Sequence, residues 1–387
     1  MALCLFRIVT RNRDWLDSPT LYANTLAACP DSYYIRRDLG AIYWERGDID
    51  SAKREWLEAF KTNPTYSLNS SSLGLVYLRE QSYPQALEYF KKALELDPSS
   101  ADAHLNVGVT YMNMQSLELA EPELRTAVRL KPLSSAARNA LGKLYLDEGR
   151  MAEAEEQFHQ SVEIEPNITA YGNLGLIHWR RGEATLAEQQ WRQALRLAPN
   201  DSSILNNLGL VCTKLQRYPE AVSFFRKAIQ LSPNDPSPHS NLGITYMKSG
   251  QQGLAETEFR AALSLAPQKY ETRNRLGMLY LEGGRVEEAE EQFRLSLKTK
   301  ENDAGYCGLG EIYLRRGERG AAERAFQSAA RLEPSNSQAR FRLGALYLAQ
   351  GRKAEALREY QAGLKSDPEN SEAIAAAQKL SAQVGQN

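Results

Sequence analysis

Ten glycines follow one another along this 387-residue chain at an almost constant interval. The interval is 34 positions, as from Gly40 to Gly74, and it shortens to 33 at two steps. A fixed period of this length is typical of helical repeats that stack into a solenoid, in which each repeat contacts only its neighbours. The sequence therefore predicts one elongated domain. The ten copies are Gly40, Gly74, Gly108, Gly142, Gly175, Gly209, Gly243, Gly277, Gly310 and Gly344.

Other positions keep the same register when the recurring glycine is numbered position 8. Position 20 is alanine in every repeat, position 24 is bulky, and position 32 is proline except at Glu301. Positions 4, 7, 8 and 11 lie on one face of a first helix, whereas 20, 24 and 27 lie on one face of a second. The small residues let the two helices approach closely, and the bulky residue fills the space beside them.

This pattern resembles the tetratricopeptide repeat (TPR), and it covers most of the chain. The resemblance implies an all-α fold, a right-handed α-solenoid or TPR superhelix, with about ten helix-turn-helix repeats and a capping helix at each end. We expect an apolar junction segment at 1–18, an N-terminal capping half-repeat at 19–32, ten repeats at 33–370 and a C-terminal capping helix at 371–387.

Charge and composition exclude some classes of partner and chemistry. The chain has 47 basic and 48 acidic residues, so no global attraction to nucleic acid is expected. Histidines and cysteines lack the spacing of zinc ligands, and no phosphate loop or nucleophile elbow occurs. His178 and Cys212 occupy position 11, which is otherwise tyrosine, so we expect both in the core. The sequence predicts a non-enzyme without metal or cofactor.

The segment 1–18 fits no repeat. Met1–Val9 is apolar but much shorter than the roughly 20 residues that span a bilayer. Thr10–Asp17, with Arg11, Asp14 and Trp15, resembles the junction between the last membrane helix and the TPR array in polytopic glycosyltransferases of the O-mannosyltransferase type. That resemblance implies membrane attachment through a preceding region and an extracytoplasmic location. The alternative is an amphipathic capping helix on a cytoplasmic protein.

The first helices of a TPR array line its concave surface, so positions 2, 5, 6, 9, 12 and 13 are candidate binding positions. Asparagine recurs there, and its amide has both a donor and an acceptor for a peptide backbone. The row resembles the asparagine ladder of the O-GlcNAc transferase family. Alternatively, these amides bridge neighbouring repeats. The asparagines are Asn106, Asn139, Asn173, Asn206, Asn207, Asn241 and Asn274.

Aromatic and basic residues share that predicted groove. Trp179, Arg180, Lys214 and Lys248 lie at positions 12 and 13, and such residues commonly anchor protein interfaces. The residue set of the chaperone-tail carboxylate clamp is not found in any three consecutive repeats.

The two shorter steps predict a tightened turn and a small change of twist. They lie between Pro166 and Gly175 and between Glu301 and Gly310, and each lacks one position that the other steps have.

Two functional hypotheses follow. The first is a non-catalytic interaction scaffold that binds a protein or extended peptide in the groove. The second is a substrate-presenting or regulatory region of a membrane glycosyltransferase whose catalytic part lies outside this chain. The sequence selects neither an oligomeric state nor a compartment.

Overall fold

The computed structural model describes residues 22, 26 and 31–384. The predicted junction segment at 1–18 lies outside these residues, as does most of the capping half-repeat at 19–32. None of the helices in the described part of the chain is both long and apolar enough to cross a membrane.

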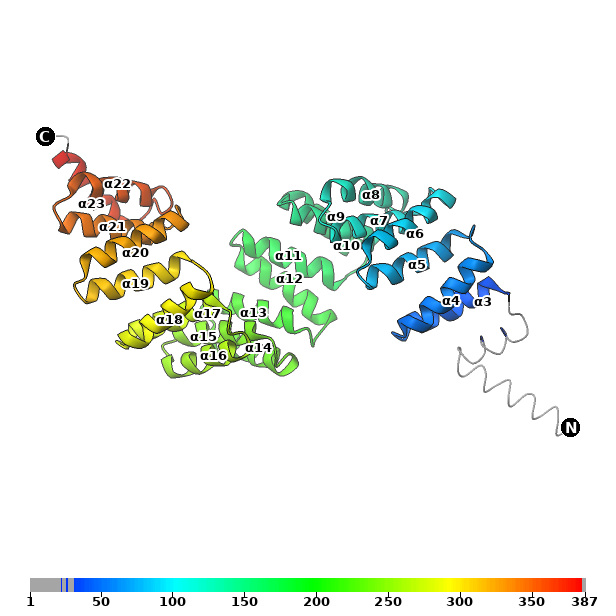
Figure 1. Cartoon of the computed structure of the whole chain (residues 1–387), viewed down its shortest axis with the longest axis horizontal. Helices are drawn as coiled ribbons and strands as arrows, with labels where there is room; N and C mark the ends of the chain where they lie inside the picture. Colours follow the sequence, from blue (N-terminus) through cyan, green and yellow to red (C-terminus); the bar gives the residue numbers. More distant parts are fainter. Residues whose placement is uncertain (1–21, 23–25, 27–30, 385–387) are drawn as a thin grey trace. The chain divides into compact units, whose positions relative to one another are not determined.

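The described chain is all-helical, and its helices form the predicted helix-turn-helix pairs (Figure 1). Each first helix begins at position 1 of its repeat and has 13 residues. The first helices are α3 (Tyr33–Glu45), α5 (Ser67–Arg79), α7 (Ala101–Asn113), α9 (Ser135–Asp147), α11 (Ile168–Arg180), α13 (Ser202–Lys214), α15 (Pro236–Lys248), α17 (Tyr270–Glu282), α19 (Asp303–Arg315) and α21 (Ser337–Ala349).

Each second helix begins at position 17 and has 14 residues, except for the 12-residue α22. The second helices are α4 (Ile49–Thr62), α6 (Tyr83–Leu96), α8 (Leu117–Leu130), α10 (Met151–Ile164), α12 (Ala184–Leu197), α14 (Tyr218–Leu231), α16 (Gln252–Leu265), α18 (Val286–Thr299), α20 (Arg319–Leu332) and α22 (Lys353–Leu364).

The chain divides into two compact units, residues 1–197 and 198–387. Within each unit, the two helices of a repeat pack against each other, and the second helix packs against the first helix of the next repeat. Neighbouring first helices also contact one another, as α7 and α9 do in unit 1 and α13 and α15 do in unit 2. The first helices of each unit therefore form a shared face.

The last helix, α23 (Ser371–Val384), packs against α22. Ala373, Ala377 and Leu380 are buried against the end of the array, in one cluster with Tyr360. This helix covers apolar surface that the tenth repeat would otherwise expose.

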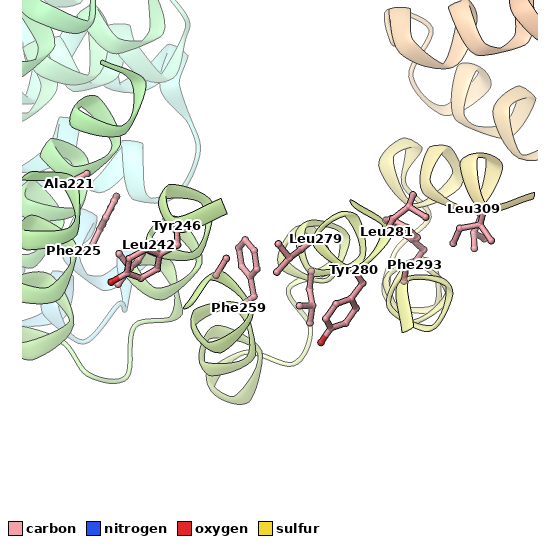
Figure 2. Packing of buried hydrophobic residues seen from close by; sticks show 14 of the residues in the cluster. Ala221, Phe225, Leu242, Tyr246, Phe259, Leu279, Tyr280, Leu281, Phe293 and Leu309 are labelled. Carbon is pink, nitrogen blue, oxygen red and sulfur yellow. The ribbon is translucent and has the colours of Figure 1, made fainter. Parts of the chain in front are cut away.

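The core of each repeat is the contact between the glycine at position 8 and the side chain at position 24. A Cβ atom built on Gly243 would lie 2.7 Å from the ring of Phe259, and one on Gly40 would lie 2.4 Å from Trp56. Phe259 is fully buried and belongs to the continuous cluster that Figure 2 shows in unit 2. The helices therefore cross at a distance that only glycine permits.

The turn between the two helices requires a left-handed residue at position 15. Seven repeats have glycine there, with φ between 76° and 83°. In the other three repeats the residue is Gln81, Gln115 or Gln216, each with φ 59°. Residue type does not predict the left-handed conformation of these glutamines. Only their position in the repeat indicates it.

Replacing Gly243 by alanine is expected to destabilise the array by about 1–3 kcal/mol, because the new methyl group overlaps the Phe259 ring. Guanidinium unfolding followed by circular dichroism measures this change. Gly253→Ala is the matched control: Gly253 lies in α16 with open space around its Cα, so this variant should be as stable as the wild type or slightly more stable. Equal destabilisation of both variants would contradict the packing argument.

Gln115→Gly is expected to stabilise the array by about 1 kcal/mol, because the substitution removes the steric cost of a left-handed side-chain-bearing residue. Gly149→Ala, at the same position in the next repeat, should have the opposite effect. Thermal unfolding of the two variants in the same buffer measures both changes. A loss of stability in Gln115→Gly would contradict this expectation. It would show that interactions of the glutamine side chain stabilise the fold by more than its left-handed backbone destabilises it.

Candidate peptide-binding surface

The shared face of the first helices carries a row of partly exposed apolar side chains at position 9. In unit 1 these include Leu75, Val109 and Leu176, and in unit 2 they include Leu210 and Ile244, all half-buried. Met278, in the next repeat, is 40% exposed. In unit 1 the exposed Lys143 on α9 interrupts the row between Val109 and Leu176, whereas in unit 2 the row continues from Leu210 through Ile244 to Met278. Each unit therefore has an apolar strip that a ligand can reach.

The predicted asparagines fall into two groups. Asn139 donates from Nδ2 to Oδ1 of Asn167 at 2.9 Å, and the buried Asn274 donates to Asn302 at 2.8 Å. Both therefore bond to the residue that precedes the first helix of the next repeat. In these two cases the amide bridges neighbouring repeats, which is the alternative that the sequence left open.

The remaining asparagines are less engaged. Asn241 donates to Oδ1 of Asn206 at 2.9 Å, and Asn173 donates to the carbonyl of Thr169 within its own helix. Asn106 and Asn207 are half-buried, and neither side chain has a hydrogen-bond partner among the described residues. Their amides are therefore available to a ligand on the first-helix face.

The position-5 bridges depend on the short step between repeats. Only residues 165–167 connect α10 to α11, whereas four residues connect most other pairs, so the predicted tightened turn is confirmed. Asn167 caps α11 by accepting from the N–H of Ala170. Its Nδ2 donates to Oγ of the buried Ser161 at 3.0 Å and to the carbonyl of Glu165 at 2.8 Å. One asparagine thus joins two helices and the turn between them.

The second short step has the same network and explains an interruption in the row. Asn302 donates to Oγ of Ser296 at 3.0 Å and caps α19 through the N–H of Gly305. At position 6 of this repeat the residue is Gly308, where a Cβ would lie 2.4 Å from the Phe293 ring. No asparagine fits there, because α19 approaches the preceding repeat too closely.

The predicted anchors lie at the end of the first helices. Trp179 is half-buried, with its ring centroid 6.2 Å from that of Trp191. Arg180, Lys214 and Lys248 are exposed in the last turns of α11, α13 and α15. These residues give the edge of the face a positive charge.

His178 and Cys212 are buried, as the register predicts. His178 is 6% exposed, and its Nδ1 lies 2.7 Å from a carboxylate oxygen of Glu183. Cys212 is fully buried in the core cluster of unit 2. Both side chains serve packing.

A cavity of about 190 Å³ opens between α17, α19 and α21, and its walls include residues that the sequence did not mark. Cys307 and Glu311 lie in its wall, and Glu311 pairs with Arg342 of the next repeat. Burial raises the pKa of the Cys307 thiol to about 12. Cys307 lies at position 5 and Glu311 at position 9 of their repeat, and both are predicted groove positions. The register is therefore the signal that could have identified these two residues.

Comparison with known proteins identifies the repeat. A model of the C-terminal domain of Cilia and flagella-associated protein 70 matches residues 135–308. Models of tetratricopeptide repeats match residues 74–115, 101–132 and 307–371. The chain is built of tetratricopeptide repeats. A search of the curated proteins found no match.

Solved TPR structures share the fold. Yeast Tom70 is 17% identical, with a TM-score of 0.55 over 91% of this chain and 96% of Tom70. A tetratricopeptide repeat protein from Parabacteroides merdae is 21% identical, with a TM-score of 0.55 over 64% of this chain and 98% of its own. Human IFIT1, a dimer with m7Gppp-AAAA, is 16% identical, with a TM-score of 0.50 over 90% and 94% of the two chains. At these identities the likeness concerns the fold alone.

Asn167→Ala is expected to destabilise the TPR array by about 2–3 kcal/mol, because it removes a helix cap, leaves the Asn139 amide without its acceptor and removes one of the two hydrogen bonds of the buried Ser161 hydroxyl. Asn106→Ala is the control and should change stability by less than about 0.5 kcal/mol, since its side chain has no hydrogen bond. Urea unfolding measures both. Equal effects would mean that the short-step network contributes nothing beyond an ordinary surface asparagine.

Proposed function

We propose that this protein is a non-catalytic scaffold that binds an extended peptide along the first-helix face of its TPR repeats. The observation that carries the proposal is the combination, on the first-helix face of each unit, of a half-buried apolar strip with an asparagine amide that has no hydrogen-bond partner among the described residues, Asn106 in unit 1 and Asn207 in unit 2. An apolar strip alone would bind any ligand that has an apolar surface. Unpaired amides beside it favour a ligand with regularly spaced backbone N–H and C=O groups.

The geometry of packed helices suits an extended chain. Neighbouring helices in contact have axes about 8–10 Å apart, which corresponds to roughly three residues of extended peptide. One position-6 side chain per repeat therefore meets about every third residue of the ligand. The apolar side chains at position 9 lie between these points and can hold the ligand's own apolar side chains.

The charge at the edge of the face favours acidic residues in the ligand. Arg180, Lys214 and Lys248 are exposed there, although the whole chain has a net charge of −1. These charges attract carboxylates of the ligand, and salt screens this attraction because the charges are exposed to solvent. We infer a peptide partner with apolar side chains and at least one carboxylate.

The second hypothesis, a substrate-presenting region of a membrane glycosyltransferase, rests on the resemblance of residues 10–32 to the junction in that class. In that setting, the same face would bind the acceptor polypeptide. The coding sequence upstream of Met1 distinguishes the two hypotheses: in-frame hydrophobic segments would support the glycosyltransferase, whereas a stop codon beside a ribosome-binding site would support a separate scaffold.

Selection of linear twelve-residue peptides from a display library on the full chain tests the proposed binding. We expect the selection to enrich peptides with apolar and acidic residues. Asn106→Ala, Asn173→Ala and Asn207→Ala should together weaken their binding, each by about fivefold where it loses one hydrogen bond. Fluorescence anisotropy measures the affinity.

Gln230→Ala is the matched control, because Gln230 is exposed on the second helix α14 rather than on the first-helix face. Circular dichroism confirms that each variant is folded. Failure to enrich any peptide, or equal affinity of the asparagine variants and the wild type, would contradict the proposal.

A further inference from the structure

A longer period lies above the single repeat. Many residues recur 135 positions further along the chain, a distance of four repeats. Neighbouring repeats share chiefly the core positions: position 6 is Asn106 in one repeat and Ala140 in the next. The longer period also preserves residues at further positions, some of them half-buried and some of them buried. Identical pairs include His104 and His239, Asn106 and Asn241, Met112 and Met247, Asn139 and Asn274, Tyr145 and Tyr280, and Asn167 and Asn302.

Several of the paired residues make the same contacts in both places. His104 Nδ1 lies 2.6 Å from a Glu123 oxygen in unit 1, and His239 Nδ1 lies 2.6 Å from Glu258 in unit 2. The guanidinium of Arg150 lies 4.1 Å from the centre of the Tyr145 ring. The equivalent pair of Arg285 and Tyr280 has the same 4.1 Å separation.

The short steps follow the same period. Asn167 and Asn302 each donate to a buried serine hydroxyl at 3.0 Å and each receive the amide of a position-5 asparagine. Gln81 and Gln216, which the same interval relates, share φ 59°. The helices α5–α9 of unit 1 and α13–α17 of unit 2 are therefore two copies of one structural block.

The similarity extends in part to the candidate binding face. Of the nine residues at positions 6, 9 and 12 on the three first helices of each copy, five match, and most of these are half-buried on the first-helix face. The other four differ: Ser72 and Asn207, Leu78 and Thr213, Ala140 and Arg275, and Lys143 and Met278. Asn106 in the first copy has no hydrogen bond that would require an asparagine, so packing does not explain why Asn241 matches it. The matching pairs are Leu75 and Leu210, Asn106 and Asn241, Val109 and Ile244, Met112 and Met247, and Leu146 and Leu281.

Charge gives both copies the same polarity. The first helix of each copy ends in a basic residue, Arg79 or Lys214, and the third ends in an acidic one, Asp147 or Glu282. An extended ligand with a carboxylate near one end and a cation near the other matches both faces in one direction only. Three helices about 8–10 Å apart span roughly six residues of such a ligand.

We propose that the chain has two related peptide-binding faces, one on α5–α9 and one on α13–α17, and binds two copies of the same short extended segment. This inference rests on the proposed peptide-binding function and adds its stoichiometry and the size and polarity of its ligand. The partner is then a protein that contains the segment twice or an assembly that presents several copies of it.

Isothermal titration calorimetry of the full chain with one library-selected twelve-residue peptide tests the proposal. The wild type should bind two peptides. Asn106→Arg and Asn241→Arg should each leave one site, and the double variant should leave none. Arginine is tolerated at position 6, since Arg275 and Arg342 are exposed there in later repeats. On the middle helix of a face, its long side chain would cover the apolar strip of both neighbouring helices, whereas the native Arg275 lies on the last helix of the second face.

Gln230→Arg adds the same charge on a second helix and should still bind two peptides. A wild-type stoichiometry of one would overturn the two-face proposal while leaving peptide binding intact. Loss of all binding in one single-arginine variant that remains folded by circular dichroism would also overturn it. If the selection enriches no peptide at all, both the proposed function and this inference fail.

Discussion

The close contact between a glycine and a large side chain in each repeat controls the rest of this structure. Because Gly243 has no Cβ, the ring of Phe259 lies directly against its backbone, and the two helices of the repeat cross at short distance. The same contact in ten repeats orients every first helix in the same way relative to its second helix. The side chains at positions 6, 9 and 12 therefore share one face within each unit, although they come from different repeats.

The sequence predicted this framework well, because packing at a fixed period leaves a signal at every repeat. Helix starts, the left-handed glycines and the burial of His178 and Cys212 all follow from the register. The roles of individual asparagines do not. Asn139 and Asn106 are the same residue type on adjacent first helices, yet only Asn139 meets a partner, because a shortened turn brings Asn167 within 2.9 Å. Residue type alone cannot reveal a contact that depends on the length of the turn between α10 and α11.

The short turns and the contacts between neighbouring repeats both follow the four-repeat period. Each short turn needs three residues that lie within one repeat: a position-5 asparagine, a position-27 serine and the asparagine that caps the next first helix. In a solenoid, stability is a sum of terms within repeats and between neighbours. Contacts between neighbours, such as Arg150 with Glu121 and Arg285 with Glu256, recur only where two adjacent repeats recur together. A block of four repeats preserves both kinds of contact, and it carries much of its first-helix face with it.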